Sequence, residues 1–178
     1  WDVTYFRRPR FNPQSNCYPN VLLSDVVQPL SKTAQRVNPG ESPSEDFNYL
    51  GMENVEPITG NVKGETIRQG SAIKSTCVVF NKGLVLYGKL RPYLRKVVDC
   101  SELVFEQGVA SSEFICLRPK EFLVSQAWLA YYLRSSAVAE QAKVAIGARM
   151  PRISPNVLLS MCIPLPPLPV QKQIMERV

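Results

Sequence analysis

The chain has 178 residues, contains no histidine, and carries 21 basic against 15 acidic side chains, a formal net charge of +6. The lack of histidine excludes His-based acid–base chemistry and most catalytic zinc sites. With 45% apolar residues, the chain can bury a core, and its basic balance favours an anionic partner. No apolar run is long enough to cross a membrane, so we expect no membrane association.

The five cysteines are odd in number and form no C-x-x-C pair, which favours buried free thiols in a reducing cytoplasm. No P-loop, no Gly-rich loop for S-adenosylmethionine and no acidic nuclease motif occurs in the sequence. We therefore expect no catalytic residue, no metal and no cofactor. Because the chain begins at Trp1 rather than at a methionine, we also expect it to be part of a longer protein.

The first third of the chain gives weak structural signals. Residues 1–20 are polar and rich in proline, and they are predicted to be irregular. The segment 21–30 is compatible with either a strand or a short helix capped at Ser24. Residues 37–46 resemble a loop, residues 47–55 predict a strand and a turn, and residues 56–75 predict a hairpin or an extended loop.

The middle of the chain is dominated by strand signals. Residues 76–80 and 84–90 flank the turn Asn81-Lys82-Gly83 and predict a β-hairpin. If the second strand continues, its alternation places Lys89, Arg91 and Tyr93 on one face, and Pro92 indicates an edge or a bend. Residues 96–98 and 113–117 are further strand candidates.

Helical signals begin after Phe122. Residues 125–135 predict a helix capped at Ser125, with Trp128 and the two following tyrosines in the core. Residues 136–147 predict a second helix that ends at Gly147 and forms a helical hairpin with the first. A helical turn at 156–161, a proline-rich extended segment and a final helix from about residue 169 complete the chain.

The positive charge is concentrated in one stretch. Residues 63–96 contain eight basic side chains and a single acidic one, Glu65, which amounts to a net +7. Tyr87 and Tyr93 lie among these cations, and cations interleaved with aromatic residues are typical of nucleic-acid surfaces. The alternative is a solvated basic face that binds nothing.

The sequence contains, in this order, the motifs GLVLYGKLRPYLRKV (83–97), GVASSEFICLRP (108–119), the helix with WLAYYLRS, the turn GARMPRIS and the exit CIPLPPLPVQKQI. Together these motifs resemble one known family, the specificity subunits of type I restriction-modification systems. The resemblance covers roughly residues 50–178. The exit departs from the family pattern at Val170-Gln171-Lys172-Gln173, where an acidic residue before a glutamine is common.

The resemblance implies a target-recognition domain that binds double-stranded DNA and reads one half of a bipartite site without catalysis of its own. It also implies three partners: methyltransferase (M) subunits, a restriction and translocase (R) subunit, and a second target-recognition domain reached through a spacer helix. Residues 1–168 would form the recognition domain, and residues 169–178 would begin the spacer. The alternative function is a basic module that binds an acidic protein.

We expect an α/β (α+β) fold with a curved, mostly antiparallel β-rich body. The candidate DNA-binding residues are Lys63, Arg68, Gln69, Lys74, Tyr87, Lys89, Arg91, Tyr93, Arg95, Lys96, Arg149 and Arg152. The candidate partner-helix residues are Val170, Ile174 and Val178, which recur every four residues. The competing interpretations are a core position for both tyrosines, a capping turn for Arg149 and Arg152, a solvated loop for residues 63–74, and packing of the last helix on its own domain.

Overall fold

A computed structural model describes residues 18–28, 35–145 and 151–178. The strands are β1 Asn20–Leu22, β2 Arg36–Val37, β3 Asp46–Leu50, β4 Ile67–Gln69, β5 Cys77–Asn81, β6 Val85–Gly88, β7 Val97–Asp99, β8 Gln107–Ser111, β9 Phe114–Leu117 and β10 Cys162–Pro164. The α-helices are α1 Leu23–Val26, α2 Gln126–Leu133, α3 Ser136–Ala145, α4 Pro155–Leu159 and α5 Leu168–Met175. Short 3₁₀ turns are η2 Pro39–Glu41, η3 Met52–Asn54, η4 Gly70–Ala72, η5 Pro92–Leu94 and η6 Cys100–Glu102.

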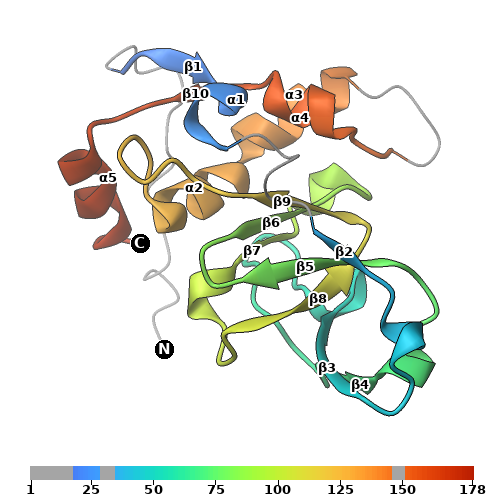
Figure 1. Ribbon diagram of the computed structural model, residues 1–178. Coiled ribbons are helices and arrows are strands. Elements are labelled where there is room, and N and C mark those ends of the chain that lie inside the picture. Colours follow the sequence, from blue (N-terminus) through green and yellow to red (C-terminus); the bar gives the residue numbers. More distant parts are fainter. Residues whose placement is uncertain (1–17, 29–34, 146–150) are drawn as a thin grey trace, which may run out of the picture.

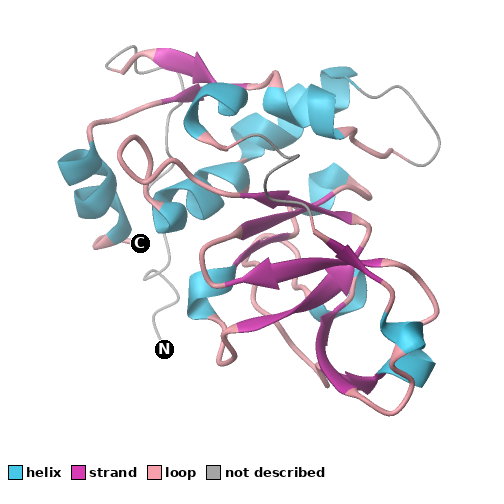
Figure 2. Ribbon diagram, viewed as in Figure 1, coloured by secondary structure: helices cyan, strands magenta, loops and turns pink. Residues whose placement is uncertain are grey.

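The strands form three sheets (Figures 1 and 2). The helices gather on one side of the two larger sheets, and the two-stranded sheet β1-β10 lies beside the helices. The sheet orders are β7-β6-β9, β2-β5-β8-β3-β4 and β1-β10. Every strand pair is antiparallel except β3 with β8, which is parallel. The predicted α+β class with a mostly antiparallel body is confirmed.

The three-stranded sheet β7-β6-β9 is buried on both faces. Val85 and Tyr87 of β6 point into a core shared with the helices, whereas Leu86 points into a second core shared with the five-stranded sheet. Successive side chains of a strand point to opposite faces, so a strand between two layers needs an uninterrupted apolar run. The segment Leu84–Tyr87 is such a run, and this explains why its sequence shows no polar alternation.

The predicted hairpin between residues 76–80 and 84–90 is wrong. The strands β5 and β6 exist and the turn between them is closed by a hydrogen bond from Leu84 N to Asn81 O at 3.1 Å. However, β5 pairs with β8 and β2, while β6 pairs with β7 and β9. The turn is therefore a corner that carries the chain from one sheet to the next, and both flanking strands have partners distant in sequence.

The first helix of the predicted pair is confirmed in its start and its core. The hydroxyl of Ser125 accepts a hydrogen bond from Trp128 N at 3.3 Å and caps α2. Trp128 and Tyr132 are buried and stack with ring centroids 5.3 Å apart, whereas Tyr131 is half-buried. The second helix, α3, follows directly, and the predicted stop at Gly147 lies outside the described residues.

The amino-terminal segment contains both of the alternatives that its sequence allowed. Residues Asn20–Leu22 form β1, which pairs with β10, and the next four residues form α1. The helix begins after Leu22, so Ser24 lies inside it and does not cap it. The strand pairing places the extended proline-rich segment beside the start of the described chain.

Helix α5 is attached to the domain by a buried amide. Gln171 is fully buried; its Oε1 accepts from Ser125 N at 2.8 Å, and its Nε2 donates to Leu123 O at 3.0 Å and Pro166 O at 2.8 Å. The predicted stripe does not act as one buried face, because Ile174 packs against the core while Val178 is 58% exposed. Val170, the third member of the stripe, is half-buried.

The free thiols are placed largely as predicted. Cys77, Cys100 and Cys116 are buried, whereas Cys162 is exposed, against expectation. Burial raises the pKa of the Cys116 thiol to about 11, so this residue is a protonated part of the core. Within the described residues, no helix is long and apolar enough to cross a membrane.

Candidate nucleic-acid interface

Two basic segments that are sixty residues apart in sequence lie side by side. Arg91 N donates to Pro151 O at 2.8 Å, Ile153 N donates to the carbonyl of Lys89 at 3.0 Å, and Leu90 forms an isolated bridge with Arg152. The segment after β6 thus pairs with residues 151–153 through a single β-bridge. This pairing brings the backbones of Lys89, Arg91 and Arg152 together. The sequence identified all three residues but gave no signal that they share one surface.

The charges in this region are only partly compensated. Arg152 pairs with Glu113, and the ammonium of Lys89 donates to the carbonyl of Ser112. Burial lowers the pKa of Lys89; Glu113 opposes this shift, and the cations Arg152 and Arg36 add to it. Lys89 therefore lies near two other cations, Arg36 and Arg152, and one carboxylate, Glu113, so the region has a net positive charge.

Arg36 is the residue that sequence reasoning missed. It lies at the start of β2, and together with Lys89 and Ser112 it lines a small pocket of about 80 Å³. The first third of the chain, where Arg36 lies, has a net negative charge. The charge pattern therefore gave no reason to select Arg36. Only the pairing of β2 with β5 brings it beside β9 and the turn after β6. We call Arg36, Lys89, Arg91, Tyr93 and Arg152 the basic face.

The predicted strand through Lys89, Arg91 and Tyr93 is wrong beyond Gly88. The backbone of Arg91 is left-handed, with φ 49°, and residues Pro92–Leu94 form the turn η5. Pro92 does mark a bend, as predicted. Figure 1 shows η5, in light green, below α3, and residues of these two elements contact each other. Arg91 is exposed and Tyr93 is 47% exposed, so both reach the surface in spite of the change in backbone.

Three other candidates from this stretch point inward. Tyr87 is 1% exposed, and burial raises the pKa of its hydroxyl to about 12. Lys96 donates to Met52 O at 2.6 Å, and Arg95 donates to Arg134 O at 3.4 Å. The DNA-facing assignment is wrong for Tyr87, because alternation along a doubly buried strand turns its ring into the core. Through these hydrogen bonds, Lys96 and Arg95 hold the turn η5 against the neighbouring segments at Met52 and Arg134.

The remaining candidates form a second group at the edge strand β4, which Figure 1 places at the far end of the five-stranded sheet from η5. Arg68 pairs with Glu53 at 3.0 Å and lies over the ring of Tyr49, 4.5 Å from its centroid. Lys63 pairs with Glu56, while Gln69 and Lys74 are exposed. Arg149 lies outside the described residues. The predicted residues therefore divide between two surfaces.

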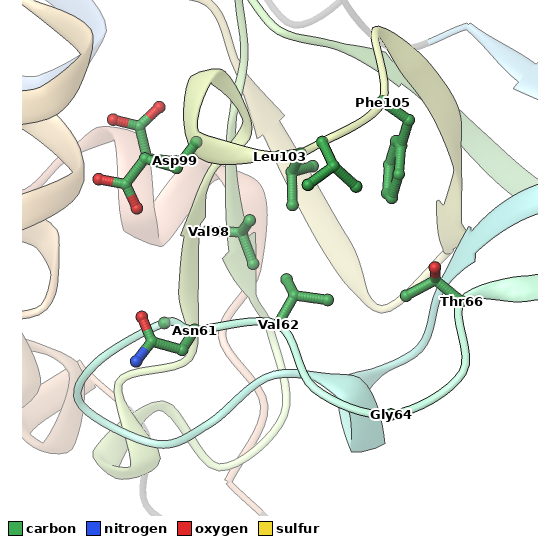
Figure 3. Close-up of a pocket in the computed structure, with 11 residues that line it drawn as sticks. Asn61, Val62, Gly64, Thr66, Val98, Asp99, Leu103 and Phe105 are labelled. Atoms are coloured by element: carbon green, nitrogen blue, oxygen red, sulfur yellow. The ribbon is translucent and has the colours of Figure 1, made fainter.

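A second, more voluminous cavity is acidic and lies elsewhere. It has a volume of about 380 Å³, and Figure 3 shows Asn61, Val62, Leu103 and Phe105 around it. Asp99 and Glu102 are its charged residues, so it repels phosphate. Among the residues that the structure describes, no group of three or more His, Cys, Asp or Glu side chains could hold a metal ion.

A mixed α+β body with a partly compensated basic face is compatible with a nucleic-acid-binding domain. The family model for the type I restriction modification DNA specificity domain matches residues 22–178, so the chain belongs to that family. The resemblance of the sequence motifs is confirmed.

Individual relatives agree with this membership. The type I restriction enzyme EcoDI specificity subunit of Escherichia coli is 26% identical over 131 residues, which are 73% of this chain and 28% of that protein. The HsdS subunit of Thermoanaerobacter tengcongensis has the same fold, with a TM-score of 0.76 and 23% identity over 89% of this chain and 40% of that one. A second structure, of a type I R-M system in a study of complex assembly and conformational transition, matches with a TM-score of 0.75 and 24% identity, over 89% of this chain and 40% of that one. The chain thus spans well under half of these relatives.

Proposed function

We propose that this chain binds double-stranded DNA and reads one half of a bipartite target for a type I restriction-modification complex, without catalysis of its own. The observation that carries the proposal is the basic face of a chain that belongs to a DNA specificity family: Arg36 lines a pocket with Lys89, and the segments of Arg91 and Arg152 pair through their backbones. An interface assembled from turns outside the closed core suits DNA reading, since turns can differ without disturbing the fold.

The basic face divides into two kinds of contact. Arg36 and Arg91 are exposed and form no ion pair with any described residue, which suits them to phosphates. Arg152 is held by Glu113, and an arginine whose fork is oriented by a carboxylate suits the paired acceptors of guanine in the major groove. Phosphate contacts fix the register, and oriented side chains supply the sequence preference.

The expected partners follow from the same proposed function. Residues 169–178 would begin a spacer that leads to a second target-recognition domain and offers a surface to the M subunits and the R subunit. In support, Leu168 at the start of α5 is 36% exposed and Val178, beyond the end of α5, is 58% exposed, while Gln171 ties the helix to the domain. A helix held rigidly at its base could transmit the orientation of the recognition domain to its continuation.

The test is selection from a pool of duplexes with a randomised centre, at a salt concentration that suppresses non-specific binding. We expect the chain to enrich one short, asymmetric motif. Incubation with S-adenosylmethionine, magnesium and ATP should neither methylate nor cut the enriched duplex. Enrichment of no motif, with equal binding to an acidic protein, would replace the DNA assignment with the protein-binding alternative.

A further inference from the structure

The backbone departs from ordinary conformations at one place. In the described part of the chain, three residues other than glycine have positive φ: Ile58 at 70°, Arg91 at 49° and Arg95 at 53°. All three meet at η5, because Arg91 and Arg95 flank the turn and Ile58 N donates to Leu94 O at 3.1 Å. Left-handed conformations are unfavourable for side chains of this kind and persist only where surrounding contacts impose them.

The contacts around η5 impose these left-handed backbone conformations. Leu94 N donates to Arg91 O at 2.8 Å, Arg95 N donates to Pro92 O at 2.9 Å, and the N–H of Arg91 is held by Pro151 O. Pro92 is buried, and its ring fixes one backbone angle of the turn. Helix α3 packs against the turn from the other side. The turn is therefore rigid before any ligand arrives.

This rigid turn presents apolar side chains to solvent. Tyr93, at its centre, is 47% exposed, and Ile58, joined to the turn through Leu94, is 42% exposed. Tyr93 makes no hydrogen bond or ring contact with any residue that the structure describes. The neighbouring Arg91 is an exposed cation. The exposed apolar surface of Tyr93 and Ile58 is unfavourable in water. Covering this surface with a ligand would therefore lower the free energy, and the adjacent cation would favour a negatively charged ligand.

We propose that Tyr93, supported by Ile58, is a wedge that enters a base step of the bound duplex while Arg91 grips the adjacent phosphate. The inference rests on the proposed DNA-binding function. Apolar side chains inserted between base pairs unstack and kink the duplex. Pyrimidine–purine steps unstack most easily, so the wedge itself would favour such a step and add to specificity without hydrogen bonds to bases. Because the turn is preformed, insertion requires little ordering of the protein.

The experiment uses the motif selected by the wild-type chain, with the fluorescent base 2-aminopurine placed at successive positions. Its emission rises when stacking is lost. We expect one step to brighten on binding. Tyr93→Ala should abolish the rise and weaken binding by roughly tenfold or more, without a change in the salt dependence. Tyr93→Phe should keep both the rise and the affinity.

The matched control is Phe122→Ala, which removes an exposed aromatic ring, 74% exposed, before the start of α2. This variant should bind and brighten like the wild type. The wedge is refuted if no position brightens, if Tyr93→Ala keeps its affinity, or if Tyr93→Phe loses it, and in each case the selected motif leaves the DNA-binding function standing. If the wild-type chain selects no motif, the proposed function fails before the wedge is tested.

Discussion

The charges of the basic face should appear directly in the salt dependence of DNA binding. We consider the triple variant Arg36→Ala, Arg91→Asn and Arg152→Ala. Asparagine is chosen at position 91 because it tolerates the left-handed backbone that Arg91 adopts there. All three side chains belong to exposed residues, but removal of Arg152 leaves Glu113, 23% exposed, without its ion-pair partner, so the unfolding transition of the variant is measured beside that of the wild type. Lys89 is left intact because its ammonium is held by the carbonyl of Ser112.

The expected magnitude follows from counterion release. Each cation that neutralises a phosphate contributes about 0.9 to the slope of log affinity against log salt. Three lost contacts lower the slope by about 2.7, and the loss is about 1.8 if the pairing of Arg152 with Glu113 already neutralises its charge. Between about 50 and about 200 mM salt, a slope difference of about 2.7 makes wild-type affinity fall roughly 40-fold further than that of the variant.

The assay is fluorescence anisotropy with a short mixed-sequence duplex over a range of salt concentrations. The control variant replaces Lys143, Lys172 and Arg177 with alanine and removes the same charge from exposed positions on and beside α3 and α5. Its slope should stay close to that of the wild type. Equal slopes for both variants would show that total charge alone drives binding, and a wild-type slope in the basic-face variant would move the interface to the β4 edge.

Three further predictions concern stability and specificity. Gln171→Leu leaves three backbone groups without their hydrogen-bond partner and should lower the free energy of unfolding by about 2–3 kcal/mol in denaturant titrations. An unchanged midpoint would mean that α5 contributes little to the stability of the domain. Burial raises the pKa of Tyr87 and of Tyr132 to about 12, so the unfolded state loses these protons first as the pH rises. Stability should therefore fall between about pH 10 and 12, by about 1.4 kcal/mol per tyrosine per pH unit, and Tyr87→Phe should flatten the curve in thermal melts. Glu113→Gln releases Arg152, so the affinity for random-sequence DNA should rise and its salt slope should steepen by about one unit. The preference for the selected motif should become smaller. A lower affinity for random-sequence DNA would count against the positioning role of Glu113.

The sequence predicted the elements well where local signals decide them. The cap at Ser125, the bend at Pro92 and the apolar strand β6 all depend on neighbouring residues. Strand partners were not predictable in this way, because pairing of β5 with β8 and of β6 with β9 depends on contacts far along the chain. A short Gly-containing turn between two apolar runs is as compatible with a corner between sheets as with a hairpin.

The candidate site was predicted in composition but not in arrangement. The charge surplus of residues 63–96 drew attention to the stretch that contains the exposed Arg91, yet the same stretch also contains inward-pointing groups such as Tyr87. Arg36 was missed because its local sequence is not basic, and Tyr87 was misplaced because a strand buried on both faces turns every side chain into a core. Charge counting favours an anionic partner, whereas the sheet pairing decides which cations reach the surface.

The closed central sheet also limits how this domain can read DNA. Both faces of β7-β6-β9 are covered, by the helices and by the five-stranded sheet, so none of its core side chains can reach a duplex. The exposed cations Arg91 and Arg152 instead lie in the turns that leave this sheet and return beside it. In the proposed mode of DNA binding, recognition is separated from stability: exposed residues in these turns can change while the core stays intact, and a domain of this build could acquire a new target through its turns alone.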